Sequence, residues 1–165
     1  MEQQQQRYTL GKSDKLKSTK AIEQLFKEGK SFSAFPFRVL YLEALHPESR
    51  GPASSPLQTT AKYTEAGPQD SSRRASGYLQ TAFSVSKKHF KKAVDRNRIK
   101  RLMREAWRLQ KNVLASKING NNKNLKVFII YTGNELPEYD LVVEKTATVI
   151  KRLIKICNET TVTNT

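Results

Sequence analysis

Residues 96–104 read Arg-Asn-Arg-Ile-Lys-Arg-Leu-Met-Arg, and a helix sorts them into two opposite faces. At about 100° per residue, one face is apolar and can enter a core; it comprises Ile99, Leu102, Met103, Ala106, Leu109 and Val113. The other face carries Asn97, Lys100, Arg101, Arg104, Arg108 and Lys111, with Arg96 and Arg98 at the boundaries. Like charges at these spacings repel. The pattern therefore predicts an amphipathic helix whose charged face binds a polyanion.

The charge of the chain is concentrated around this segment. The 165 residues carry a net charge of +15. Between Tyr78 and Ile118, twelve Lys and Arg face only two acids, Asp95 and Glu105. A solvated charged face is the alternative interpretation, but such faces usually mix signs. The concentration favours nucleic acid as the partner.

Other classes of protein are disfavoured by the composition. Cys157 is the only cysteine, which excludes an intramolecular disulfide, and the two histidines, His46 and His89, are too few for a structural zinc site. No apolar run approaches the roughly 20 residues of a membrane span. The start of the chain is polar and glutamine-rich, unlike a secretory signal. We expect a cytoplasmic protein that does not associate with membranes.

Periodicity predicts an α/β fold, a two-layer sandwich with a mixed sheet. The expected order is helix, strand, strand, helix, strand, helix. The first helix is capped by Ser18 or Thr19 and ends at Gly29. Strands are expected at 35–43, 78–86 and 125–131, a long helix at about 94–115, and a last helix with Pro137 in its first turn. The last helix should bury Val143, Ala147, Ile150, Ile154 and Cys157.

The chain is expected to form one domain with flexible ends. Residues 1–17 and 159–165 read as tails around a single RNA-binding domain at 18–158. Residues 46–77 hold four of the six prolines and show no periodicity. They are predicted to be a disordered insertion within that domain.

The basic segment resembles a known family. The sequence Phe-Ser-Val-Ser-Lys-Lys at 83–88, then Ala-Val at 93–94, then the run from Arg96 to Ala106, is similar to the signature of the protein subunit of bacterial ribonuclease P. The resemblance implies a left-handed βαβ crossover, an exception to the usual hand. It also implies that the catalyst is an RNA subunit that removes the 5′ leader of precursor tRNA with bound Mg²⁺. The implied partners are that RNA and precursor tRNA, and no catalytic or metal-binding residue is assigned to this chain.

The resemblance also implies two sets of contacts. The RNA subunit would be bound by Arg96, Asn97, Arg98, Lys100, Arg101, Arg104 and Arg108. The leader would lie in a cleft lined by Phe26, Arg38, Ser84, Ser86, Lys87 and Lys88. Two family aromatics of that cleft are replaced here by Ile22 and Leu40, and the spacer between Lys88 and Arg96 lacks the usual Gly-Asn. Aliphatic side chains cannot stack on a base as an aromatic ring does.

Several residues keep a second interpretation. Asn97 or Asp95 could cap a helix, Phe26 could be a core residue, and Ser84 and Ser86 could be ordinary strand residues. For the whole chain, a general structured-RNA-binding or ribosome-associated protein is the alternative function. A self-sufficient nuclease would need clustered carboxylates or a His/Lys/Ser arrangement. The sequence offers neither in the basic segment.

Overall fold

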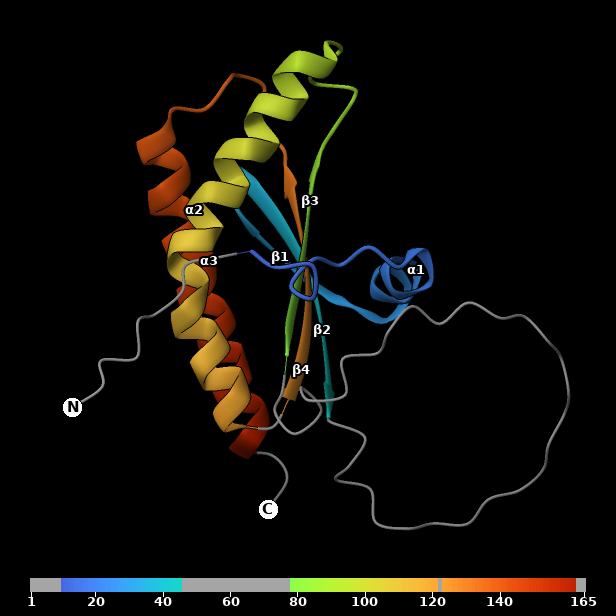
Figure 1. Ribbon diagram of the computed structural model, residues 1–165, viewed down its shortest axis with the longest axis vertical. Helices are drawn as coiled ribbons and strands as arrows, with labels where there is room; N and C mark the ends of the chain where they lie inside the picture. Colours follow the sequence, from blue (N-terminus) through green and yellow to red (C-terminus); the bar gives the residue numbers. More distant parts are fainter. Residues whose placement is uncertain (1–9, 46–77, 122, 163–165) are drawn as a thin grey trace, which may run out of the picture.

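The computed structural model describes residues 10–45, 78–121 and 123–162. A four-stranded sheet carries helices on both faces (Figure 1). In chain order the elements are α1 (Thr19–Glu28), β1 (Lys30–Ala34), β2 (Phe37–Leu45), β3 (Leu79–Val85), α2 (Ala93–Gly120), β4 (Lys123–Tyr131) and α3 (Tyr139–Val162). The predicted mixed α/β class is confirmed, with β1 as one strand more than expected. The predicted insertion at 46–77 lies outside the described residues.

The sheet has the spatial order β1-β2-β4-β3. β1 pairs with β2 and β2 with β4 in antiparallel fashion, whereas β3 and β4 run parallel. The segment β3–α2–β4 is therefore a parallel βαβ unit, the unit for which the resemblance implies a left-handed crossover. The hand of that crossover stays a prediction.

Alternation along the strands separates two faces of the sheet, as predicted. On β2, Phe37, Val39 and Tyr41 are buried beneath the pair α2 and α3. The intervening Leu40 is buried with Leu25 of α1. We call these the α2–α3 face and the α1 face. α2 and α3 form one helical layer, and α1 covers part of the opposite face (Figure 1).

The main core lies between the sheet and the α2–α3 layer. Trp107 is fully buried there and packs edge-on against Phe83, with 6.2 Å between ring centroids. A second, smaller core lies under α1 and is built on Leu16, Leu25 and Leu40. Burial of these apolar surfaces on both sides fixes the sheet between its helices.

The first helix begins and ends as the sequence predicts. The Ser18 side chain accepts a hydrogen bond from the Ala21 N–H, 3.4 Å away, and so caps the helix. At the other end Gly29 donates its N–H to the Leu25 carbonyl. Its φ is −71°, so no left-handed turn is made. A Cβ at Gly29 would collide with the Leu25 carbonyl oxygen, and this close approach explains the glycine.

The buried stripe of α2 is rotated from the predicted one. The helix buries Ile99, Met103, Ala106, Trp107, Lys111, Leu114 and Ile118. Leu109 and Val113, predicted to be buried, are 40% and 60% exposed. Lys111, predicted on the charged face, is only 8% exposed. The prediction failed because it assigned Lys111 to the charged outer face, whereas the side chains of Lys111 and Trp107 are both buried.

The ends of the described chain also differ from expectation. Asp14 and Leu16, predicted within a flexible tail, hydrogen-bond to β3 through Thr81. α3 begins at Tyr139, after Pro137, and continues into the predicted C-terminal tail as far as Val162. Its buried residues are Val142, Thr146, Val149, Ile150, Leu153 and Cys157. Only Ile150 and Cys157 of the predicted stripe are fully buried, since the helix is turned by about one residue.

Candidate nucleic-acid interface

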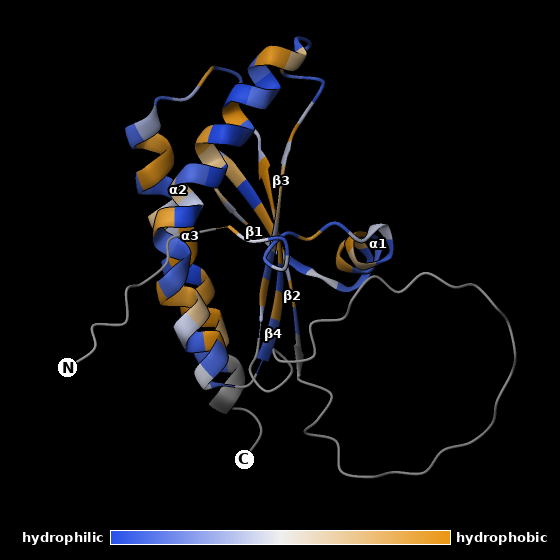
Figure 2. Ribbon diagram, in the orientation of Figure 1, coloured by the Kyte–Doolittle hydropathy of each residue, from blue (hydrophilic) through white to orange (hydrophobic). Residues whose placement is uncertain are grey.

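A line of polar and cationic side chains runs along the outer face of α2. Asn97, Arg101, Arg104 and Arg108 follow one another at i, i+4, i+7 and i+11, which spans about 16 Å of helix. The first three are exposed and Arg108 is half-buried. Hydrophilic residues alternate with hydrophobic ones along α2 (Figure 2). Because α2 starts at Ala93, Asn97 lies inside the helix and does not cap it.

Most of these side chains have no partner among the described residues. No side-chain hydrogen bond or ion pair is made there by Asn97, Arg98, Lys100, Arg101 or Arg104. Arg108 differs, because its guanidinium binds the Glu105 carboxylate at 2.5 Å. That hydrogen bond lowers the pKa of the Glu105 carboxyl. The unpartnered cations repel one another and can bind phosphate bidentately where they are arginines.

Arg96 has a different place from the rest of the predicted set. Its guanidinium donates to the carbonyl oxygens of Phe90 and Lys91, at 2.8 and 2.6 Å. These bonds tie the start of α2 to the loop that precedes it. Arg96 therefore orients the basic helix, and a direct contact with RNA stays a prediction for this residue.

The unpartnered side chains surround a shallow hollow at the start of α2. It is lined by Val94, Asn97, Arg98, Arg101 and Leu102. Val94 is 76% exposed, so apolar surface lies beside an amide and two guanidinium groups. A hollow of this composition can hold a base or a ribose while the cations bind the adjoining phosphates.

A second group of predicted residues meets on the α1 face. In the strand register Arg38 of β2 lies opposite Ile130 of β4, which lies beside Ser84 of β3. These three form one row across the sheet. In the next row Phe128 contacts Phe26 of α1, with ring centroids 5.2 Å apart at 65°. Arg38, Ser84 and Phe26 are thus brought to one face, as the resemblance implies.

Phe26 is exposed on this face. Its exposed fraction is 51%, so it is not the core residue of the alternative interpretation. Leu40 is buried, and Ile22 packs against the small core. Leu40 of β2 and Ile22 of α1, which replace family aromatics, therefore help to pack α1 onto the sheet. Phe128, which the sequence analysis did not select, supplies an aromatic ring beside Phe26. Its only signal in the sequence is its position in the apolar run of β4.

The remaining predicted residues lie in the loop after β3. Lys87 and Lys88 are exposed there, and Ser86 is half-buried. The Ser86 hydroxyl oxygen accepts the N–H of Lys88 at 3.2 Å. Ser86 thus shapes the turn that presents the lysines at the end of β3, next to Ser84.

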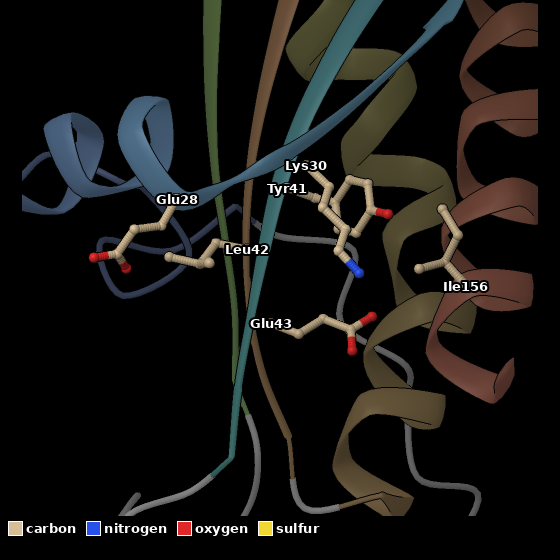
Figure 3. Close-up of a pocket in the computed structure, with 6 residues that line it drawn as sticks. All are labelled: Glu28, Lys30, Tyr41, Leu42, Glu43 and Ile156. Atoms are coloured by element: carbon tan, nitrogen blue, oxygen red, sulfur yellow. The ribbon is translucent and has the colours of Figure 1, made fainter. Parts of the chain in front are cut away.

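The structure brings no catalytic group together in the part of the chain that it describes. No cluster of three or more His, Cys, Asp or Glu side chains is placed to hold a metal ion among these residues. A small pocket beside β2 contains the carboxylates of Glu28 and Glu43 (Figure 3). They project to opposite sides of the strand and cannot act on one reacting atom. None of the described helices is long and apolar enough to cross a membrane.

Fold and site together define a small, strongly basic α/β domain with a helix face on which most cations have no partner among the described residues. The sequence profile of the Ribonuclease P family matches residues 10–155. The ribonuclease P protein component of Porphyromonas gingivalis is 33% identical over 132 residues, covering 80% of this chain and 77% of the relative. That of Chlorobaculum tepidum is 64% identical over 36 residues, covering 22% of this chain and 23% of the relative. The chain belongs to the ribonuclease P protein family.

Solved structures agree on the fold. The ribonuclease P protein of Thermotoga maritima superposes with a TM-score of 0.54 at 22% identity, covering 84% of this chain and 96% of that chain. The Staphylococcus aureus protein gives 0.52 at 19% identity, covering 86% and 95%. At these identities the likeness concerns the architecture alone. It supports the mixed sheet and three helices described above.

Proposed function

We propose that the chain is the protein subunit of ribonuclease P and that it binds two RNAs on separate surfaces. The outer face of α2 binds the catalytic RNA, and the α1 face binds the 5′ leader of precursor tRNA. The observation that carries the proposal is the run of cations on α2 that have no partner among the described residues, because a bound polyanion would neutralise their mutual repulsion.

Each surface suits its proposed ligand by chemistry. Arginine forks on a rigid helix can bind phosphates of a structured RNA, and Asn97 can donate and accept toward a base or ribose. On the α1 face, Phe26 offers a ring on which an unpaired base can stack. Ser84 and Arg38 offer a hydroxyl and a cation for the backbone of the same strand. The leader is single-stranded. Its unpaired bases can stack on an aromatic ring, whereas the paired bases of a helical stem cannot.

The proposed role leaves the chemistry to the RNA. Mg²⁺ at the active site of the RNA subunit would supply Lewis-acid stabilisation. This chain would help by neutralising phosphates and by holding the leader in position. Such a role belongs in the cytoplasm, where precursor tRNA is processed in bacteria.

Reconstitution tests the proposal. Purified, RNA-free protein should not cleave precursor tRNA, whereas the protein added to a ribonuclease P RNA should increase cleavage at low Mg²⁺. Cleavage by the protein alone would contradict the proposal. Equal affinity for many structured RNAs, without stimulation of the RNA subunit, would favour the general RNA-binding alternative.

A further inference from the structure

Residues 10–17 wrap around the β3 edge of the sheet, and we call this segment the strap. Leu10 packs against the main core on the α2–α3 face. Leu16 is buried in the small core on the α1 face. The strap therefore passes from one face of the sheet to the other before it enters α1 (Figure 1).

Hydrogen bonds fix the strap to the same strand that carries Ser84. The Thr81 N–H donates to the Asp14 carbonyl at 2.8 Å, and the Leu16 N–H donates to the Thr81 carbonyl at 3.1 Å. The Gln80 side-chain amide also donates to the Ser13 carbonyl at 3.4 Å. By alternation along β3, Gln80 and Ser84 lie on the same face. The strap thus borders the α1 face. Thr81, to which it is bonded, lies three residues before Ser84, or about 10 Å along the strand.

The outward charge of the strap is wholly positive. Its one acid, Asp14, is turned inward, where the carboxylate binds Lys111 at 2.5 Å and accepts the Gly11 N–H at 2.9 Å. Lys12, Lys15 and Lys17 are exposed. Their ammonium groups have no partner among the described residues. Three cations are therefore held at the border of the α1 face, and no acid among the described residues pairs with them.

We propose that the strap lysines bind the upstream part of the leader, beyond the nucleotides held on the α1 face. A strand of RNA that passes Lys88 at the end of β3 and then Ser84 reaches the strap by continuing along the same edge. The proposed contacts are to phosphates, so they depend on the length of the leader and not on its sequence. This inference rests on the proposed function and extends its leader-binding surface.

A series of precursor tRNAs with leaders lengthened one nucleotide at a time tests the inference. For wild-type holoenzyme, affinity should rise in two stages, first as the α1 face is filled and then as the leader reaches the strap. Joint replacement of Lys12, Lys15 and Lys17 by Ala should remove only the second stage. The slope of log affinity against log salt for long leaders should fall in magnitude by about 0.7 per lost phosphate contact, or about 2 in total.

Two further variants make the comparison specific. Replacement of Lys30, Lys151 and Lys155 by Ala removes the same charge from β1 and α3, and all three side chains are exposed. β1 and β3 are opposite edges of the sheet, so this control should keep the second stage. Replacement of the three strap lysines by Arg keeps their charge and should also retain it.

The outcomes are distinct. The inference would be overturned if the alanine variant lost as much affinity for mature tRNA, or for the RNA subunit alone, as for precursor tRNA. The strap lysines would then belong to the surface that binds the RNA subunit. A second stage that survives in the alanine variant would show that the strap lysines are merely solvated. If wild-type protein gains nothing from any leader, the proposed function fails as well, and the inference fails with it.

Discussion

The ammonium nitrogen of Lys111 lies 2.5 Å from a carboxylate oxygen of Asp14, which joins residues 97 positions apart in the chain. The lysine side chain is 10% exposed and the aspartate 32%. Burial by itself would raise the pKa of the Asp14 carboxyl. The hydrogen bonds from Lys111 and Gly11 and the charge of the lysine outweigh burial, and they lower the pKa below its ordinary value of 3.8. The ion pair is therefore a stabilising link between α2 and the strap.

Asp14→Asn should destabilise the fold, because it leaves the Lys111 charge buried without its counter-ion. We expect a loss of about 1–3 kcal/mol in the free energy of unfolding, less than for a fully buried pair because Asp14 is partly exposed. Urea denaturation measures this loss. Glu105→Gln is the matched control. It breaks the exposed ion pair with Arg108 on α2, the helix that carries Lys111, and should change the free energy of unfolding little.

The same pair predicts a pH dependence. A carboxyl whose pKa is lowered by folding stabilises the native state above its unfolded pKa, and this contribution is lost as the pH falls through the folded pKa. The stability difference between wild type and Asp14→Asn should therefore be constant near neutral pH and shrink below about pH 4. A difference that persists unchanged at lower pH would mean that the carboxylate charge is not what stabilises the strap.

Arg101→Ala and Arg104→Ala should each weaken the salt dependence of binding to the RNA subunit. If each arginine neutralises one phosphate, the slope of log affinity against log salt should fall in magnitude by about 0.7–0.9 per substitution. Filter binding at several salt concentrations measures the slope. Lys155→Ala, on the exposed side of α3, should leave it unchanged. Binding that does not vary with salt would exclude the electrostatic interpretation of α2.

Arg98→Ala and Lys88→Ala should separate the two RNA surfaces. Arg98 lines the hollow on α2, so its loss should weaken binding to the RNA subunit by about 1.5–3 kcal/mol. Lys88→Ala keeps the backbone N–H that donates to Ser86, so the turn should persist. Lys88→Ala should leave the affinity for the RNA subunit unchanged and reduce the preference for precursor over mature tRNA. Equal losses in RNA-subunit affinity, with an unchanged preference, would instead indicate one continuous basic surface.

Cys157 should resist alkylation until the protein unfolds. Burial, together with the charge of Glu43 and a hydrogen bond to it, raises the pKa of the thiol to about 12, although Lys123 opposes the change. Thiol reagents react with the thiolate, which is scarce in the native state. Labelling with iodoacetamide should therefore follow the urea unfolding curve. Labelling of native protein at the rate of free glutathione would contradict the burial of this side chain.

Local patterns were sufficient to predict most elements but not their contacts across the chain. The alternation in β2 and β3 was read correctly, because each strand buries one face on the larger core. β1 was missed because its five residues bury only Phe32 strongly and follow Gly29 directly. The rotation of the buried stripe of α2 could not be predicted, because Lys111 is buried in an ion pair with Asp14. A partner so distant in sequence leaves no periodic signal.

The two groups of candidate site residues depend on different information. Side chains on α2 share a face because of helical spacing alone, which can be read from sequence. The row from Arg38 to Ser84 needed the resemblance, since it depends on how β2, β4 and β3 are ordered. Phe128 and the strap lysines were not selected, because their positions follow from packing against α1 and from pairing with Thr81.

The strand order β1-β2-β4-β3 has a consequence for how the chain is made. On the ribosome β3 is synthesised before β4, its neighbour in the sheet, so it cannot join the sheet until α2 and β4 have emerged. The strap is made earlier still and has to await β3. The β3 edge and the strap that pairs with it, which carry proposed leader contacts, are therefore completed late, after closure of long loops in the chain. A nascent chain could therefore form its basic helix before it could bind a leader. A stalled or truncated product lacking β4 would be unable to capture precursor tRNA.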